Sequence, residues 1–174
     1  MIPELGHFAL VLALAAALLL ILLPLLGAAR GDARMMATAR PLAAVQFGLL
    51  AFSFTCLVLA FVNNDFSVAY VIQNSNTNLP VWYRITAVWG GHEGSLLLWV
   101  LILAAWTVAV ALFSRALPRP LLARVLAVMG IISTGFLLFT ILTSNPFERV
   151  LPGFPLEGND LNPLLQDVGL IIHP

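Results

Sequence analysis

Long apolar runs separated by short polar connections make up most of this chain. The runs cover residues 5–29, 41–62, 95–113 and 121–142. A helix needs about 20 apolar residues to cross the hydrocarbon layer of a bilayer, and each run has about this length. The first run has no positively charged start and no Ala-x-Ala cleavage site just before the arginines that follow it, so we interpret it as a retained span rather than a signal peptide. The pattern therefore predicts four membrane-spanning helices.

The composition supports the same fold class. The 174 residues are 61% hydrophobic and 9% charged, and the mean hydropathy is +1.01, values that are typical of membrane proteins. We predict an all-α integral membrane protein in contact with lipid, and we expect no nucleic-acid partner. No acidic residue, lysine or histidine lies near the middle of any run, which argues against an ion-coupled transport site within these residues.

The charged residues are sorted between the two ends of the predicted helices. Six of the eight arginines lie in or beside the connections 30–40 and 114–120, namely Arg30, Arg34, Arg40, Arg115, Arg119 and Arg124. Cytoplasmic connections are enriched in basic residues, so these two connections are predicted to be cytoplasmic. The N-terminus and the connections 63–94 and 143–174 then lie outside, together with seven of the eight carboxylates and all three histidines.

The first outer connection contains two short predicted elements. Every second residue from 66 to 72 is apolar, which is a weak strand signal, and an asparagine-rich turn comes next at 74–78. Beyond it, Trp82, Ile85 and Trp89 recur at helical spacing, which predicts a short interfacial helix. This helix leads directly toward the third span.

Residues 89–99 read Trp-Gly-Gly-His-Glu-Gly-Ser-Leu-Leu-Leu-Trp and open the third span. Glycine lets the backbone turn tightly and lets a flat or bulky group come close, so Gly90, Gly91 and Gly94 are candidates for shaping a site. Tryptophan prefers the membrane–water boundary. Trp89 therefore either contacts a bound group or belongs to the interfacial belt.

The last residues of the chain form a second candidate site. Apolar side chains in 162–172 recur at i, i+3, i+4 and i+7, which predicts a short amphipathic helix lying in the outer interface. Asn162 and Pro163 suit its N-cap and first helical position, and Pro174 ends it at His173. A neutral imidazole at the end of a rigid element is what an axial haem ligand requires. The alternative is that His173 is a solvated interfacial side chain.

Other polar residues on this side also have two interpretations. His92 is a candidate haem contact, and the alternative is that its pairing with Glu93 holds the loop together. Arg84 and Arg149 are the outer cations available to haem propionates, and the alternative for Arg84 is lipid phosphate. His7 is interpreted as an interfacial residue at the end of a span.

The two motifs resemble the CcmF family of bacterial membrane haem lyases. The stretch from Trp82 to Trp99 is similar to the family's N-terminal region, and the ending from Asn159 to Pro174 is similar to its next outer segment. The motifs occur in the family's order, and the likeness extends over all 174 residues. In this family the histidine of the His-Pro pair is held to be one of two outer axial ligands of the transferred haem, which implies that role for His173.

The resemblance implies a part in cytochrome c maturation in the bacterial inner membrane. Haem b, the substrate, would arrive from a CcmE-type haem chaperone, be held at the periplasmic face, and be joined through thioethers to apocytochrome c with a CcmH-type subunit as partner. Complete family members also hold a resident haem b. They are several times longer and carry a Trp-rich segment and a partner histidine that are missing here. Residues 1–174 are therefore expected to be the N-terminal transmembrane module of a longer haem lyase, either a fragment or a split-gene product, and not competent alone.

Three alternatives stay open at this point. The nearest is the nitrite-reductase-associated paralogue of the same lyase. The other two are a non-catalytic membrane assembly scaffold and a fragment of a transporter. A haem stain of purified membranes distinguishes a lyase from a scaffold.

The sorting of arginines predicts the topology of the chain. Alkaline phosphatase is active only outside the cytoplasm, so fusions after Ile72 and after Asp160 should be active. Fusions after Arg34 and after Arg119 should be inactive. Phosphatase activity of the Arg34 fusion would reverse the orientation and every outer-face assignment.

Overall fold

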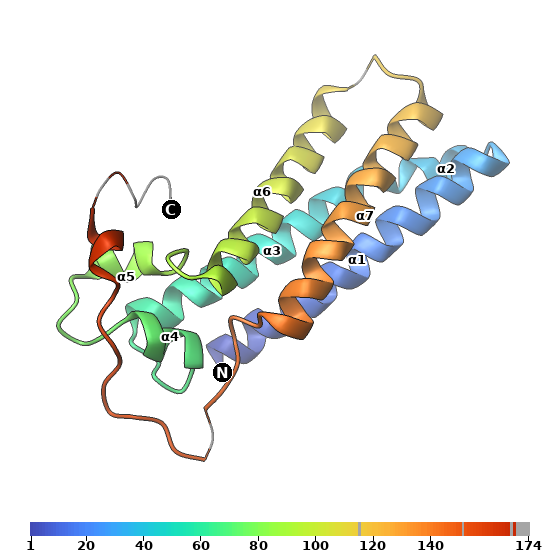
Figure 1. Ribbon diagram of the computed structural model, residues 1–174. Coiled ribbons are helices and arrows are strands. Elements are labelled where there is room, and N and C mark those ends of the chain that lie inside the picture. The colour runs from blue at the N-terminus through green and yellow to red at the C-terminus, as the bar shows by residue number, and fades with distance from the viewer. Residues whose placement is uncertain (115, 151, 168, 170–174) are drawn as a thin grey trace.

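The computed structural model describes residues 1–114, 116–150, 152–167 and 169 (Figure 1). The long helices are α1 (Ile2–Arg30), α3 (Ala39–Val62), α6 (His92–Phe113) and α7 (Arg119–Thr143). The shorter elements are α2 (Ala33–Ala37), α4 (Ala69–Asn74), α5 (Val81–Ala87) and the 3-10 helix η1 (Pro163–Gln166).

The four long helices are the predicted spans. Each is long and apolar enough to cross a membrane, and each begins and ends within three residues of its predicted run. The prediction of an all-α membrane protein with four spans is therefore confirmed. α1 packs against α3 and α7, while α6 packs against both α3 and α7. The helices thus close into an elongated four-helix bundle (Figure 1).

Apolar side chains cover the outside of the bundle as well as its inside. Leu57 and Leu97 are fully buried, whereas Phe8, Trp106 and Phe139 are more than half exposed. This distribution suits a bilayer, where the surroundings are as apolar as the core. Burial of apolar surface cannot by itself hold helices together in such surroundings, so close packing has to do it.

Small residues provide that close packing along α1. The buried residues on its inward face include Gly6, Ala9, Ala13, Ala16 and Ala17. A Cβ atom at Gly6 would lie 2.6 Å from the ring of Phe147 and 2.9 Å from the Cβ atom of Cys56. Ser53 on α3 donates a buried hydrogen bond of 2.9 Å to the Gly6 carbonyl oxygen. The absence of a side chain at Gly6 therefore allows α1 and α3 to touch.

A tight turn joins α1 to α2 at the arginine-rich end. Gly31 has a φ of +71°, in the left-handed region that favours glycine at a helix end. The Asp32 carboxylate caps α2 by accepting two backbone N–H groups of its first turn. α2 then folds back onto α1, where a Cβ atom at Gly27 would lie 2.7 Å from the Met36 nitrogen. The predicted connection 30–40 is thus mainly helical.

The strand predicted at 66–72 is wrong. Residues 69–74 form α4, and the only strand-type pairing among the described residues is a single bridge between Val68 and Arg149. Tyr70 and its neighbour Val71 are both buried. Consecutive side chains of a strand point to opposite faces, whereas one turn of helix can bury two neighbours.

The two predicted outer helices have different outcomes. The helix expected from Trp82 onward is confirmed as α5. The second begins at Pro163 as expected, but its described turn is a 3-10 helix in which the Leu165 N–H donates to the Asn162 carbonyl (2.8 Å). Residues 168 and 170–174 lie outside the described residues, so the remainder of the predicted α-helix is not described, and neither is His173.

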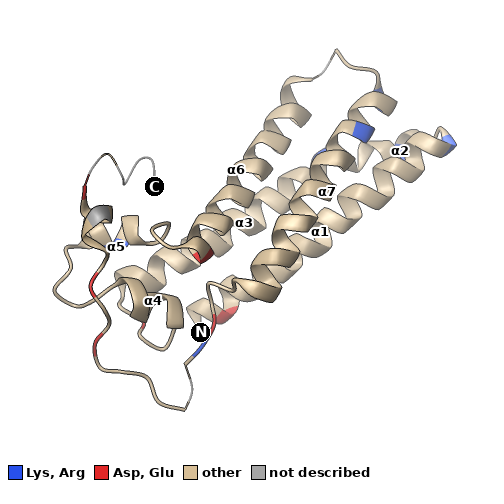
Figure 2. Ribbon diagram, viewed as in Figure 1, with Lys and Arg blue, Asp and Glu red and all other residues tan. Residues whose placement is uncertain are grey.

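Charged side chains separate toward the two ends of the bundle (Figure 2). One end holds Arg30, Arg34, Arg40, Arg119 and Arg124, and Asp32 is its only carboxylate among the described residues. The opposite end, where α4 and α5 lie, carries the other described carboxylates together with Arg84 and Arg149 (Figure 2). This separation agrees with the sorting seen in the sequence.

Replacing Gly6 by valine should destabilise the bundle, because the new side chain would overlap Phe147 and Cys56. Overpacking of this kind costs about 1–3 kcal/mol. Gly48→Val is the matched control, since nothing lies within 4 Å of a Cβ atom at Gly48 on α3. The fraction of protein that stays monodisperse after heating in detergent, measured by size-exclusion chromatography, should fall for Gly6→Val only. Equal heat resistance of the two variants would contradict the close α1–α3 contact.

Candidate functional site

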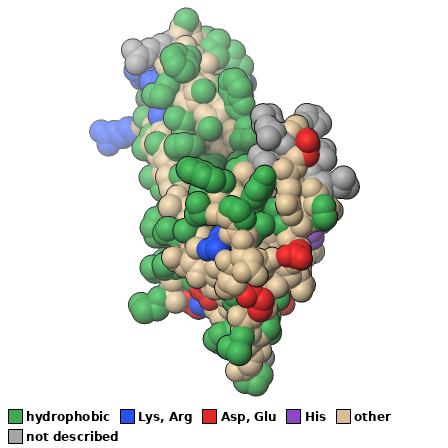
Figure 3. Space-filling model, turned by 90° about the vertical axis from the view of Figure 1, so that its left-hand side faces the viewer, with side chains coloured by type: hydrophobic (Ala, Val, Ile, Leu, Met, Phe, Trp, Pro, Cys, Tyr) green, Lys and Arg blue, Asp and Glu red, His purple; other side chains and the backbone are tan. Residues whose placement is uncertain are grey.

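The acidic end of the bundle is covered by a structure that we call the cap, made of the described residues in 63–91 and 144–166. Figure 3 looks toward this end and shows acidic side chains scattered over it, with hydrophobic side chains both above and below them. The glycine corner, residues 89–95, joins the cap to α6. Both motifs singled out in the sequence therefore reach the same end of the molecule.

Tyr70 on α4 holds the glycine corner in place. Its ring is 2% exposed and packs edge-on against Phe61 with ring centres 5.3 Å apart. Its hydroxyl accepts the Gly91 N–H at 2.9 Å and donates to the Val88 carbonyl oxygen at 3.0 Å. Burial raises the pKa of Tyr70 above its ordinary value, so the phenol stays protonated and fills both roles.

The glycines of the corner make room for other parts of this protein. A Cβ atom at Gly91 would lie 2.7 Å from the Tyr70 ring, and one at Gly94 would overlap the Val88 carbonyl oxygen. At Gly90 it would lie 2.8 Å from a Leu165 methyl group. The sequence suggested that these glycines admit a bulky group, and in the structure Tyr70, Val88 and Leu165 are what approach them.

His92 begins α6 and ties it to the end of α7. Its Nδ1 lies 3.2 Å from the Glu93 carboxylate and its Nε2 lies 2.7 Å from the Ser144 hydroxyl. This Ser-His-Glu order matches that of a hydrolytic triad, but Ser144 is only 3% exposed, so its oxygen is closed to a dissolved substrate. The arrangement favours the interpretation of His92 and Glu93 as a structural tie.

Arg84 on α5 is used to bind backbone carbonyl groups. Its guanidinium donates to the carbonyl oxygens of Leu79 (2.7 Å), Thr77 (2.7 Å) and Val62 (3.3 Å). These carbonyls belong to the end of α3 and to the loop before α5. Arg84 therefore ties the loop to the bundle, and an anion could take its place only by displacing these contacts.

Arg149 joins three segments of the cap and bundle in the same way. Its side chain donates to Glu4 at the start of α1 (2.9 Å) and to Asp65 (3.4 Å), and it also contacts the Ser67 hydroxyl. The backbone beside it is paired as well, since the Val150 N–H donates to the Ser67 carbonyl at 3.0 Å. Both outer arginines that were candidates for propionates thus already have partners.

A polar clasp fastens the later part of the cap to the loop after α4. Glu157 accepts the backbone N–H of Thr77 at 2.9 Å and its hydroxyl at 2.5 Å, and these bonds lower the pKa of Glu157. The Asn159 N–H donates to the Ile72 carbonyl at 2.7 Å. Leu161, two residues further on, is 1% exposed. The chain is therefore anchored immediately before η1.

The segment that leads to His173 contacts the glycine corner. Leu165 in η1 and Trp89 both pack against the same core cluster, and the Leu165 side chain is the nearest group to a Cβ atom built at Gly90. Two motifs that lie about 70 residues apart in the sequence therefore meet at one surface. His173 itself lies outside the described residues.

No group of three His, Cys, Asp or Glu side chains within the described ranges is placed to hold a metal ion. His92 has a partner at each ring nitrogen, as described above. His7, the predicted end-of-span residue, lies beside the cap and lines a cavity of about 440 Å³ together with Phe147 and Arg149. The described part of the cap is thus a scaffold next to which a histidine ligand could be held, and the imidazoles described at this end of the bundle are His7 on α1 and His92 on α6.

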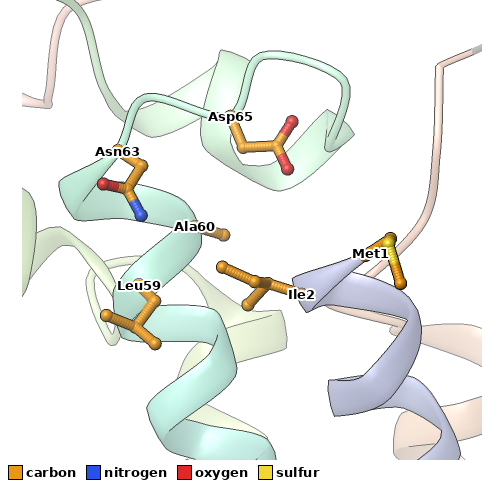
Figure 4. A pocket seen from close by; sticks show the side chains of 6 residues that line it. All are labelled: Met1, Ile2, Leu59, Ala60, Asn63 and Asp65. Carbon is orange, nitrogen blue, oxygen red and sulfur yellow. The ribbon is translucent and has the colours of Figure 1, made fainter.

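A cavity of about 490 Å³ separates the start of α1 from the end of α3 (Figure 4). Ile2 points toward Ala60, while Asn63 and Asp65 lie above them (Figure 4). The Asp65 carboxylate is bound by Arg149, and the rest of the lining is mainly aliphatic. No reactive side chain among the described residues lines this cavity.

Sequence reasoning missed the central role of Tyr70 and the contact with Ser144. The role of Tyr70 could have been suspected from the presence of a tyrosine among apolar residues, because a buried phenol needs a hydrogen-bond partner. Ser144 gave no signal, since its partner is 52 residues away.

Comparison with known proteins points to one family over the whole chain. The family model described as "Cytochrome C assembly protein" matches residues 89–174. The cytochrome c-type biogenesis protein CcmF of Pseudomonas aeruginosa is 67% identical over 174 residues, which are 100% of this chain and 26% of the relative. The cytochrome c-type biogenesis protein NrfE of Haemophilus influenzae is 43% identical over 100% of this chain and 27% of its own length.

A solved structure gives the same result. A cytochrome c haem lyase CcmF matches with a TM-score of 0.79 and 31% sequence identity, covering 88% of this chain and 26% of that chain. This chain therefore spans about a quarter of the length of the curated relatives and of the solved structure that it matches.

Replacing Tyr70 by phenylalanine should loosen the glycine corner, because the Gly91 N–H and the Val88 carbonyl both lose their partner. Leaving buried polar groups unpaired costs about 1–3 kcal/mol. Deuterium exchange of the peptide that covers 88–95 should become faster. Tyr83→Phe is the control, since no hydrogen bond of the Tyr83 hydroxyl is seen among the described residues. Unchanged exchange in Tyr70→Phe would show that the corner does not depend on this hydroxyl.

Proposed function

Because the chain belongs to the CcmF family of cytochrome c-type biogenesis proteins, we propose that it acts in cytochrome c maturation as the N-terminal membrane part of a haem lyase. The observation that carries the proposal is the contact between the two motifs of the family resemblance. Leu165, eight residues before His173, packs against Gly90 of the glycine corner. The cap thereby gives the histidine-bearing segment a fixed point of attachment.

Haem b is the proposed substrate, and His173 is its proposed axial ligand at the outer face. Bound haem supplies vinyl groups, across which the cysteine thiols of apocytochrome c add to form thioethers. An axial imidazole holds the macrocycle in one orientation and tunes the iron. The role of this chain is therefore to position haem, while the thiols come from the substrate protein.

The cap residues named in the sequence have supporting roles in this proposal. Trp89, at the membrane–water boundary, offers an aromatic surface to an edge of haem. Gly90, Gly91 and Gly94 allow the corner to stay closed over Tyr70. His92, Glu93 and Arg84 keep that surface rigid through the contacts described above.

We further propose that the cap faces the periplasm and that the protein lies in the bacterial inner membrane. The gathering of arginines at the opposite end supports this orientation, since basic ends of spans remain in the cytoplasm. In this position the cap is accessible to a CcmE-type haem chaperone and to a CcmH-type subunit that handles apocytochrome c. A resident haem b belongs to the longer protein.

Similarity favours the CcmF branch over the nitrite-reductase-associated one. The identity to a CcmF of Pseudomonas aeruginosa is 67%, against 43% to an NrfE. A non-catalytic scaffold or a transporter fragment has no comparable support. The lyase activity is proposed for the full-length protein, to which this stretch contributes the cap and four spans.

The proposal predicts that His173 ligates haem iron in the full-length protein. His173→Ala removes an axial ligand, so the haem spectrum should change and haem content and cytochrome c yield should fall. Free imidazole is small enough to fill the vacant position and should partly restore haem binding.

His92→Ala is the matched comparison, because both ring nitrogens of His92 bind protein groups. Its loss should act through the α6–α7 tie and resist rescue by imidazole. Wild-type haem content, spectrum and cytochrome c yield in His173→Ala would show that the ligand assignment is wrong. Imidazole rescue of His92→Ala instead would move the assignment to His92.

A further inference from the structure

A second cavity lies at the arginine-rich end, far from the cap. It has a volume of about 440 Å³ and is lined by Met36, Ala37, Arg40, Leu117, Arg119 and Leu122. These residues come from α2, from the first turns of α3 and α7, and from the connection before α7. Segments about 80 residues apart in the sequence therefore converge on one space.

The two guanidinium groups of this cavity have no protein partner among the described residues. Both Arg40 and Arg119 are exposed, and neither side chain makes a hydrogen bond or an ion pair within the described ranges. Asp32, the only described carboxylate at this end, is used to cap α2. By contrast, Arg84 and Arg149 at the opposite end are surrounded by acceptors.

The start of α7 adds to the positive potential of this cavity. Arg119 is the first residue of α7 and Arg40 the second of α3. The start of a helix carries a partial positive charge, so basic residues are unfavourable there unless an anion is near. In the part of the chain that the structure describes, no side chain caps the first turn of either helix. α2 and α3 together form one span, Ala33–Val62, so the helix start that faces this space is that of α7, beside two arginines without a described counter-charge.

The remaining lining is apolar. Met36 and Leu122 are less than 10% exposed and form the inner wall, while Leu117 is 38% exposed. A free phosphate ion has no apolar surface to pack against such a wall, whereas a glycerol backbone and the first carbons of an acyl chain do. The cavity also lies at the ends of membrane spans, which is the depth of lipid headgroups.

We infer that this cavity binds the headgroup of an anionic phospholipid. The phosphodiester lies between Arg40 and Arg119, and the glycerol and upper acyl chain pack against Leu117 and Leu122. Basic pockets between membrane helices bind anionic headgroups by this combination of charge and apolar contact. The inference does not depend on the proposed function, because it uses only the bundle and its position in a bilayer.

The test measures phosphatidylglycerol binding to the full-length protein by native mass spectrometry, with lipid added to delipidated protein in detergent. Removing one arginine near an anionic headgroup weakens attraction about fivefold. The double variant Arg40→Gln/Arg119→Gln should therefore bind phosphatidylglycerol at least tenfold more weakly. Wild-type protein should bind phosphatidylcholine more weakly than phosphatidylglycerol.

Arg30→Gln/Arg34→Gln is the matched control, because it removes two charges from the same end without touching the cavity. It should change phosphatidylglycerol binding less than twofold. Arg40→Lys/Arg119→Lys keeps the charge but loses the planar fork that grips a phosphate, and it should bind with intermediate strength. The melting temperature of Arg40→Gln/Arg119→Gln in detergent should match that of the wild type, which separates lost binding from lost folding.

Several results would overturn the inference. Unchanged phosphatidylglycerol binding in Arg40→Gln/Arg119→Gln would show that the cavity is not the binding site. An equal loss in the control pair would mean that only the general surface charge attracts lipid. Displacement of the lipid by inorganic phosphate at millimolar concentration would identify a soluble anion as the ligand. Absence of lipid binding in the full-length protein would mean that another part of that chain covers the cavity.

Discussion

The cap depends on satisfying the backbone polar groups that appear wherever a membrane helix ends. Carbonyl and N–H groups outside regular helices are costly at an apolar boundary unless they are paired. In this protein a few side chains do most of that pairing. Arg84 binds three carbonyls, Tyr70 binds one carbonyl and one N–H, and Ser95 donates to the Trp89 carbonyl at 2.6 Å.

This constraint explains why the cap is built from small and bulky residues side by side. A bulky group can approach the backbone this closely only where no side chain lies in its way. Gly91 therefore lies opposite the Tyr70 ring, and Gly94 lies opposite the Val88 carbonyl. Arg84 likewise extends across the loop instead of pointing into solvent. The cap is therefore held by a small number of hydrogen bonds between residues that are distant in the sequence.

The bundle could be predicted from sequence, while most of the cap could not. Four apolar runs and sorted arginines are sufficient for the spans, because length and polarity alone decide what crosses a bilayer. The strand predicted at 66–72 failed because an alternation over seven residues is too short to exclude a short helix, and α4 begins within it at Ala69. The clasp between Thr77 and Glu157 and the tie between His92 and Ser144 join residues 80 and 52 positions apart, and single-sequence patterns carry no information about such pairs.

The anchoring of Leu165 against Gly90 sets a tether length for the residues after it. Eight residues separate Leu165 from His173, so the imidazole-bearing residue can lie at most about 29 Å from the anchor when extended. The same stretch would reach only about 12 Å as an α-helix. The contact between Leu165 and Gly90 thus limits how far from the glycine corner His173 can lie, whatever path the residues between them take.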